Sequence, residues 1–345
     1  MHRQPIAANG AATLSHAQIE RVFITGAAGY VGRNLARHFL ENGVAVVAMV
    51  RSETSAERLK QLGAEIFVGD ILHAEMAGAM SGCDGLVHAA ADTDHGVATA
   101  RQTAINVEGT RRVIAAARQA SVRRVVHLSS DSVLADGSPL INVDETIPMP
   151  RRPAGHYSRT KAQAETIALS AATSDFAVIA LRPRMVWGRD DTTGLRMLVD
   201  MAQLGKLAWI GGGTYLTSTT HIANLCHAVE YALRRGTSAE VYFVSDGAPV
   251  QFRAFVSALL ETQGIAPPTK TVPRAIIRTM AVTGELLHTA TAGRIAPPLT
   301  LQAFAASAIE NTVNIRKAER DLAYRPIVSR EEGLAELRAL TFRGQ

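Results

Sequence analysis

Short runs of almost entirely apolar, β-branched residues alternate along the chain with longer segments whose apolar residues recur every three or four positions. The runs occupy residues 22–25, 44–50, 65–70, 85–90, 123–130, 176–183 and 240–246. The segments between them, such as 32–43 and 106–120, have the spacing of amphipathic helices. Strands that are apolar on both faces and separated by helices form parallel sheets that are covered on both sides. The pattern therefore predicts an α/β fold with a doubly wound parallel sheet, the Rossmann architecture.

The regular alternation ends after residue 188. Residues 189–218 and 250–340 contain turn sequences such as DDTTG, GGGT and APPTKTVP. We predict that residues 21–188 and 219–249 form the sheet domain and that 189–218 with 250–340 form a smaller, irregular C-terminal lobe for the substrate. Residues 1–20 have neither the apolar stretch nor the cleavage site of a secretory signal, so we expect a flexible leader.

The composition of the chain argues against several kinds of binding partner. The net charge of +5 is spread over scattered arginine pairs, without a basic tract that contains aromatic residues, so no nucleic acid is expected. No run of 18 apolar residues occurs, which predicts no membrane span. Residues 275–287 are expected to form an ordinary amphipathic helix, with a position on a membrane surface as the alternative. Cys83 and Cys226 lie in apolar settings that suit the reducing cytoplasm, and the histidines form no metal-binding motif.

The first apolar run leads directly into TGAAGYVGRN, residues 25–34, and then into a helix. Gly26 permits a tight turn, Gly29 lets the backbone approach a pyrophosphate, and Gly32 lets the helix pack on the sheet. The helix N-terminus then faces the anion. This context predicts that residues 21–188 with 219–249 are a dinucleotide-binding domain. The second strand ends without a carboxylate and offers Arg51, which favours NADP, with NAD also possible.

Residues 156–165 read HYSRTKAQAE, which places Tyr157 and Lys161 one turn apart on the same helix face. A free tyrosine has a pKa of ~10, so proton exchange near neutrality requires lowering that pKa by about three, or about 4 kcal/mol. One ammonium group about 4 Å away supplies roughly that energy. We therefore expect Lys161 to lower the pKa of Tyr157. A serine at the end of the fifth strand, Ser130 or else Ser129, is expected to bind the oxygen of the reacting group.

These segments together resemble the extended short-chain dehydrogenase/reductase family, the superfamily of NAD-dependent epimerases and dehydratases. The likeness rests on the TGxxGxxG spacing, on Gly69–Leu72 as a GDL-like stretch, on the NVEGT sequence of 106–110, and on LRPxxxYG- and YFVSDG-like segments. Residues 220–225, which are similar to a YVDNL stretch, and the YFVSDG-like segment resemble the 3β-hydroxysteroid dehydrogenase branch. The resemblance covers about residues 20–340.

The resemblance implies a role for each matching residue. The catalytic residues would be Ser130 (selected over Ser129), Tyr157 and Lys161, with Asn106 supporting the proton relay. The residues implied to hold the cofactor are Gly26, Gly29, Tyr30, Val31, Gly32, Arg51, Asp70, Ile71, Ala89, Ala90, Ala91, Tyr157, Lys161 and Pro183.

We therefore predict an NAD(P)-dependent enzyme that interconverts a secondary alcohol and a ketone on a hydroxysteroid-like or other hydrophobic small molecule. One alternative is a nucleotide-sugar epimerase or dehydratase with tightly bound NAD, because Ser130-Asp131-Ser132-Val133 resembles the Thr-Asp-Glu-Val of the dehydratases. Ser132, however, replaces the second carboxylate. The other alternative is a non-catalytic NADP-sensing protein, although such relatives usually lose the Tyr-xxx-Lys pair. A cytoplasmic location and a homodimer are also expected.

Overall fold

Seven parallel strands form the main sheet in a computed structural model that describes residues 17–343. Their order across the sheet is β12-β7-β5-β4-β1-β2-β3. The strands are β1 (Arg21–Thr25), β2 (Ala45–Val50), β3 (Glu65–Val68), β4 (Gly85–His88), β5 (Arg124–Leu128), β7 (Ala177–Pro183) and β12 (Val241–Val244). Each corresponds to one apolar run of the sequence, so the predicted doubly wound parallel sheet is confirmed.

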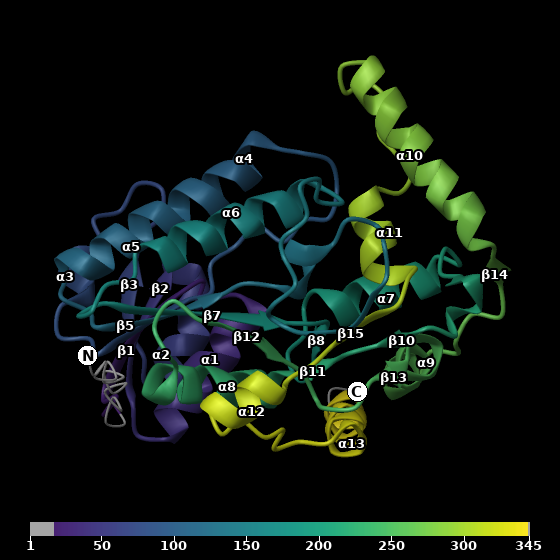
Figure 1. Cartoon of the computed structure of the whole chain (residues 1–345). Helices are drawn as coiled ribbons and strands as arrows, with labels where there is room; N and C mark the ends of the chain where they lie inside the picture. The colour runs from purple at the N-terminus through teal and green to yellow at the C-terminus, as the bar shows by residue number, and fades with distance from the viewer. Residues whose placement is uncertain (1–16, 344–345) are drawn as a thin grey trace, which may run out of the picture.

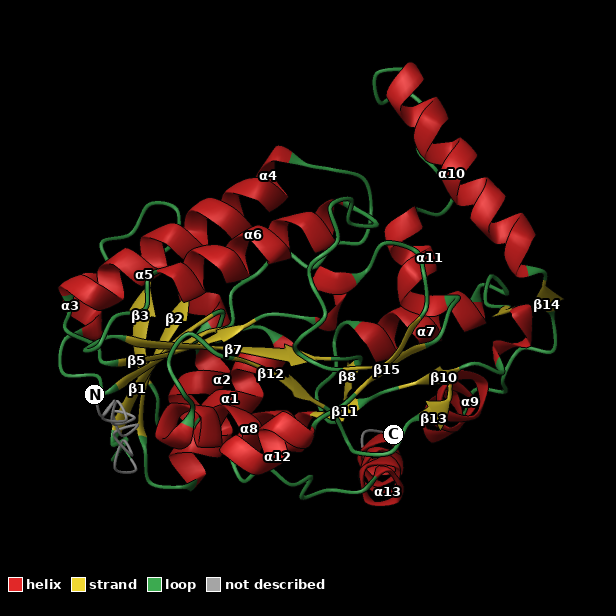
Figure 2. Cartoon of the chain, in the orientation of Figure 1, coloured by secondary structure: helices red, strands yellow, loops and turns green. Residues whose placement is uncertain are grey.

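Helices cover both faces of this sheet, as Figures 1 and 2 show. One face carries α3 (Ala77–Met80), α4 (Ala100–Thr103), α5 (Thr110–Gln119) and α6 (His156–Ser170), and the other carries α1 (Tyr30–Glu41), α2 (Glu57–Gln61), α8 (Ile222–Arg235) and α12 (Arg316–Asp321). Side chains of one strand alternate between the two sides. Val22 and Ile24 pack into the core under α1 and α8, whereas Phe23 packs into the core under α5. This double coverage explains why the strands are apolar at nearly every position.

The rest of the chain forms smaller sheets and helices beside the carboxyl ends of the main strands. A four-stranded sheet has the order β13 (Val250–Gln251), β10 (Leu216–Thr217), β15 (Asn311–Val313), β6 (Leu140–Val143). Two pairs are β8 (Val186–Trp187) with β11 (Thr220–His221), and β9 (Trp209–Ile210) with β14 (Thr271–Val272). The helices are α7 (Gly194–Gln203), α9 (Phe252–Thr262), α10 (Arg274–Ala290), α11 (Leu301–Ser307) and α13 (Arg330–Arg343). Shorter turns are η1 (Glu53–Ser55), the π-helix η2 (Ala104–Gly109), η3 (Asp131–Leu134) and η4 (Gly211–Gly213).

The two predicted domains exchange segments. β6, from the first, pairs with β15, from the second. In return, Ala318 and Tyr324 of the lobe are buried in the core beneath the main sheet. We propose that the domain boundaries predicted from the sequence hold apart from this exchange of segments.

The predicted leader, residues 1–20, lies mostly outside the described residues. Its last four residues pack on the fold, because Ile19 is buried and the backbone N–H of Ala17 donates to the carbonyl of Arg234. Residues 17–20 are therefore part of the folded protein and do not form a flexible leader.

The predicted helix over 275–287 is present as α10, which projects from the body of the molecule at the upper right of Figure 1. No helix within the described residues is long and apolar enough to cross a membrane.

Candidate active site

The turn between β1 and α1 accommodates only glycine at two positions. Gly26 has a φ of +68°, and a Cβ there would lie 2.8 Å from the backbone N and Cα of Ala90. A Cβ on Gly32 would lie 2.2 Å from the carbonyl oxygen of Gly26. Gly29 precedes α1 without a side-chain cap, so N–H groups of the first helical turn can bind an anion. The turn lies between β4 and β2, where the strand order reverses, and doubly wound sheets bind dinucleotides at this point.

Small residues line the neighbouring strand end. Ala89, Ala90 and Ala91 follow β4, and the N–H of Ala90 donates to the hydroxyl of Thr25 at 3.2 Å. Pro183 ends β7 at the same edge. The absence of large side chains at these three alanines leaves the backbone accessible to a flat ligand.

The predicted adenine side lies after β3. Asp70 accepts a hydrogen bond from the N–H of Leu72 at 2.8 Å, which fixes the turn. Ile71 is buried against Gly109, where a Cβ would lie 2.5 Å from the Ile71 side chain. Ile71 therefore contributes through its backbone and its packing.

Tyr30 and Val31 open α1. Tyr30 is buried in the core between α1 and the sheet, so only its backbone is placed to meet a phosphate. Val31 is partly buried and packs against the same core.

Arg51 follows the last residue of β2 and is exposed. It forms no ion pair with any residue between 17 and 343. A guanidinium at this position is free to pair with the phosphate on a ribose 2′-oxygen.

Tyr157 and Lys161 are both buried in the first two turns of α6. Burial raises the pKa of Tyr157 to about 12, and the nearby hydroxyl groups of Ser130 and Ser132 offset only part of this rise. Burial lowers the pKa of Lys161 to about 8, and its ammonium group donates to the carbonyl of Leu128 at 2.6 Å. The expected lowering of the Tyr157 pKa by Lys161 is therefore not present here. The physical reason is that loss of hydration outweighs every neighbouring contact of the phenol.

The two candidate serines have different partners. Ser130 is the N-cap of η3, receives a hydrogen bond from the Ser132 hydroxyl at 2.9 Å and lies beside the Tyr157 phenol. Ser129 instead donates to Glu165 at 2.6 Å, on the buried side of α6. Of the two, only Ser130 lies beside the phenol.

A buried carboxylate adjoins this hydroxyl group. Asp131 accepts hydrogen bonds from Asn311 at 2.8 Å and from Ser130 at 3.2 Å, and it pairs with the buried Arg184 at 3.3 Å. Arg184 also donates to the carbonyl of Ala306, at the end of α11. Asp131 thus connects the serine to Arg184 and, through Asn311, to the C-terminal lobe.

Asn106 lies in the π-helix η2, and irregular turns of this kind are frequent at functional sites. Its side chain exchanges two hydrogen bonds with the backbone of Asp92, at 2.8 and 3.0 Å, and donates to Thr160 at 3.0 Å. It therefore fixes the loop after β4 against α6.

Sequence reasoning missed His95, which this loop carries. The ring centroids of His95 and Tyr157 are 4.8 Å apart, and the Thr300 hydroxyl donates to the carbonyl of His95 at 2.6 Å. Burial lowers the pKa of His95, so the ring is neutral at neutral pH. Gln302 was also missed, although it accepts hydrogen bonds from both the N–H and the hydroxyl of Ser158 on α6. Neither residue belongs to a sequence motif. The path of the loop and the position of α11 bring them to the site, and neither can be read from the sequence.

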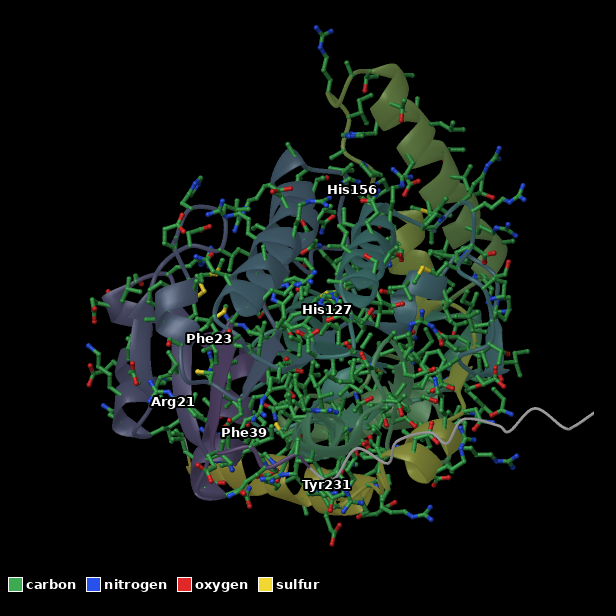
Figure 3. All side chains as sticks on the ribbon, turned by 60° about the vertical axis from the view of Figure 1, so that its left-hand side comes forward. Arg21, Phe23, Phe39, His127, His156 and Tyr231 are labelled. Atoms are coloured by element: carbon green, nitrogen blue, oxygen red, sulfur yellow. The ribbon has the colours of Figure 1, made fainter. Side chains whose placement is uncertain are left out.

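Two further histidines lie beneath Lys161. Figure 3 shows His127 in the middle of the sheet, well below His156 at the start of α6. Burial and the charge of Lys161 lower the pKa of His88 to about 3 and that of His127 well below its usual value. Both rings are therefore neutral and add no positive charge beside the lysine. No group of three or more His, Cys, Asp or Glu within residues 17–343 is arranged to hold a metal ion.

The sequence comparisons place the chain in one family. Residues 23–274 match the model of the 3-beta hydroxysteroid dehydrogenase/isomerase family. The chain is 43% identical to the 4-hydroxy-2-methyl-3-oxo-4-farnesyl-3,4-dihydroquinoline-1-oxide ketoreductase of Stigmatella aurantiaca, over 94% of this chain and 98% of that protein. It is 31% identical to the 3-beta-hydroxysteroid dehydrogenase of Mycolicibacterium neoaurum, over 92% and 90% of the two chains. Among solved structures, MoeE5 in complex with UDP-glucose and NAD has a TM-score of 0.71 at 25% identity, covering 94% of this chain and 99% of its own.

Proposed function

We propose that this enzyme reduces the ketone of a large apolar molecule with NADPH. The chain belongs to the 3-beta hydroxysteroid dehydrogenase/isomerase family, whose members oxidise hydroxyl groups or reduce ketones with a nicotinamide cofactor. The observation that carries the proposal is the placement of Ser130 beside Tyr157, with Lys161 one turn further along α6, at the edge of the sheet that holds the glycine turn. The chain is an NAD(P)-dependent oxidoreductase, and the direction and the substrate class are the proposed parts.

Each residue of the site has its own role in the proposed ketone reduction. When bound, the nicotinamide cofactor supplies the hydride. Tyr157 gives its phenolic proton to the ketone oxygen as that oxygen gains negative charge. Ser130 turns its hydroxyl proton from Asp131 to the same oxygen, while it keeps the hydrogen bond that it accepts from Ser132. Lys161 would hold the nicotinamide ribose, and the glycine turn and Arg51 would hold the phosphates. A pKa of about 12 keeps Tyr157 protonated at neutral pH, which is the form that a reduction needs.

Two observations support an apolar substrate. The relatives named 3-beta-hydroxysteroid dehydrogenase carry an apolar ring system in the name of their substrate. The ketoreductase of Stigmatella aurantiaca acts on a farnesylated quinoline ketone. We propose a substrate of the same class, a ring ketone that carries an isoprenoid or similarly apolar group.

A screen of ketones tests this function. We expect NADPH oxidation with at least one of a farnesylated quinoline ketone, a 3-ketosteroid and a 2-alkyl-3-oxoalkanoate, and none with a sugar nucleotide. The measurement is the loss of NADPH absorbance with purified protein. Turnover of a sugar nucleotide without net NADPH consumption, or inactivity toward all three ketones, would overturn the proposal.

The choice of NADPH over NADH depends on Arg51. Replacing Arg51 with Ala should raise the KM for NADPH about 10- to 100-fold, because a charge-assisted contact with the 2′-phosphate contributes about 1.5–3 kcal/mol. The KM for NADH should stay nearly unchanged. Arg235→Ala, an exposed arginine at the end of α8, is the matched control. An equal loss with both cofactors would contradict the assignment.

The alternatives gain no support. A dehydratase needs a free pair of carboxylates beside the serine, whereas Asp131 is held by Arg184 and Asn311 and its neighbour is Ser132. A purely sensing protein would not need Ser130 beside the buried Tyr157. A cytoplasmic location, a homodimer and the absence of a nucleic-acid partner stay predictions of the sequence.

A further inference from the structure

The imidazole of His95 lies against the catalytic phenol and has polar atoms to spare. Its ring centroid is 4.8 Å from that of Tyr157, and the two ring planes are tilted by 46°. Its nitrogens form no hydrogen bond with any residue between 17 and 343, and both stay in contact with open space. A phenylalanine would pack on the tyrosine equally well without leaving two polar atoms unpaired in a half-buried position. The nitrogens of His95 are therefore available to a bound molecule.

The backbone on both sides of His95 is held in place. The buried Gln102 on α4 donates to the carbonyl of Asp94 at 2.7 Å, and the N–H of Gly96 donates to the Asp94 carboxylate at 2.9 Å. The hydroxyl of Thr300, the N-cap of α11, donates to the carbonyl of His95 itself at 2.6 Å. A group that recognises a ligand selectively needs supporting contacts of this kind. His95 receives them from two helices.

The same helix α11 also fixes the position of the phenol. Gln302 accepts hydrogen bonds from the N–H and the hydroxyl of Ser158, at 3.1 and 2.8 Å, directly after Tyr157 on α6. A Cβ on Gly155, the N-cap of α6, would lie 2.6 Å from the Cβ of Gln302, so the two helices are in close contact there. One helix of the C-terminal lobe thus sets how the imidazole and the phenol lie relative to each other.

The ketone oxygen of the substrate needs no third donor. A carbonyl oxygen has two lone pairs, and Tyr157 and Ser130 would fill both in the proposed reduction. Burial lowers the pKa of His95, so its ring is neutral and carries one N–H donor and one acceptor nitrogen. A hydroxyl group both donates and accepts, whereas a carboxylate or a second carbonyl only accepts. A hydroxyl is therefore the group that can use either nitrogen of this ring.

We propose that His95 is a specificity-determining residue that binds a hydroxyl group on the carbon adjacent to the ketone of the substrate. The two aromatic rings are in contact, so the polar atoms that they present to a bound molecule serve neighbouring substituents. The inference rests on the proposed function, because the ketone must occupy the place between Tyr157 and Ser130 for its neighbour to reach the imidazole. It narrows the substrate class to hydroxyketones.

Calorimetric binding of a matched pair of ketones to the full-length protein loaded with NADP⁺ tests this inference. NADP⁺ has no hydride to give, so the ketones bind without being reduced. The pair is 2-hydroxy-2-methyl-1-tetralone and 2,2-dimethyl-1-tetralone, which differ by one hydroxyl in place of a methyl, and the tertiary hydroxyl cannot be oxidised to a ketone. We expect the hydroxyketone to bind about tenfold more tightly, because the dimethyl compound leaves the imidazole unpaired.

Three variants assign this difference to the imidazole. His95→Phe keeps an aromatic ring on Tyr157 but removes both nitrogens, and it should make the two Kd values equal. His95→Gln retains a donor and an acceptor and should keep part of the difference. His227→Phe is the matched control, because His227 also packs on a tyrosine, Tyr231, with 4.2 Å between the ring centroids. Tyr231 lies at the opposite end of the molecule from His156 in Figure 3, so this variant should keep the full difference.

The inference is overturned if the unmodified protein binds neither ketone or binds both equally. It is also overturned if His95→Phe keeps the difference, or weakens both ketones by the same factor, as a purely structural role of the ring would require. The proposed function fails separately, if neither ketone is reduced with NADPH although the hydroxyketone remains the tighter ligand and His95→Phe abolishes that preference.

Discussion

Tyr157→Phe is expected to lower kcat about 10³-fold, with little change in the affinity for NADPH. A positioned general acid contributes about 10²–10⁴-fold to the rate, and this variant removes only the proton that the ketone oxygen receives. The phenyl ring can keep its place against His95, whose ring centroid is 4.8 Å away, so the fold should be preserved. Steady-state rates and fluorescence titration with NADPH provide the measurements.

Two controls make this result specific. Tyr231→Phe carries the same substitution on α8, at the opposite end of the molecule from His156 in Figure 3, and should be fully active. Ser130→Ala should also reduce kcat strongly, whereas Ser129→Ala should affect stability more than turnover because Ser129 bonds to Glu165. A Tyr157→Phe enzyme that keeps more than a small fraction of its activity would show that another group supplies the proton.

Arg182→Met is expected to lower the free energy of unfolding by about 3–5 kcal/mol. Arg182 on β7 forms two hydrogen bonds to Glu165 on α6, at 2.6 and 2.9 Å, and both side chains are almost completely buried. Removal of the arginine leaves a buried carboxylate without its counterion, and a lost partner of this kind costs about that much. Urea unfolding followed by circular dichroism measures the change.

The matched control is Arg196→Met, which breaks an exposed Arg196–Asp200 pair on α7 and should cost less than about 1 kcal/mol. Replacing Arg182 by Met together with Glu165 by Leu should recover much of the loss, because no uncompensated charge is then buried. Equal effects of Arg182→Met and Arg196→Met would show that the buried pair adds no particular stability. The pair matters for the site because α6 carries both Tyr157 and Lys161.

The structural features that depend on one short segment of the sequence could be predicted. The seven main strands follow from apolar runs, and the glycine turn and the Tyr157–Lys161 pair follow from fixed spacings in one segment. The groups around Tyr157 could not be found in this way. Asn311 meets Asp131 across a separation of 180 residues, and Arg184 and His95 belong to loops whose paths depend on the whole fold.

The same limit applies to the electrostatics of the site. Sequence spacing placed the ammonium of Lys161 near the phenol of Tyr157 but gave no measure of burial. In the structure, burial is the largest influence on the pKa of both groups, and it acts on them in opposite directions. The sequence predicted that the lobe is irregular but did not predict its strands. Strands of two residues, for example β9 and β13, are too short to show an alternation of apolar and polar positions.

The pairing of β6 with β15 also bears on how this enzyme can be recombined with its relatives. The strand at Leu140–Val143 completes a sheet whose other members all lie beyond residue 215. A chimera that exchanges only the C-terminal half would therefore join an unmatched edge strand to a foreign partner. A swap of substrate preference between two such enzymes should have to move this short inner segment together with the distant half of the gene.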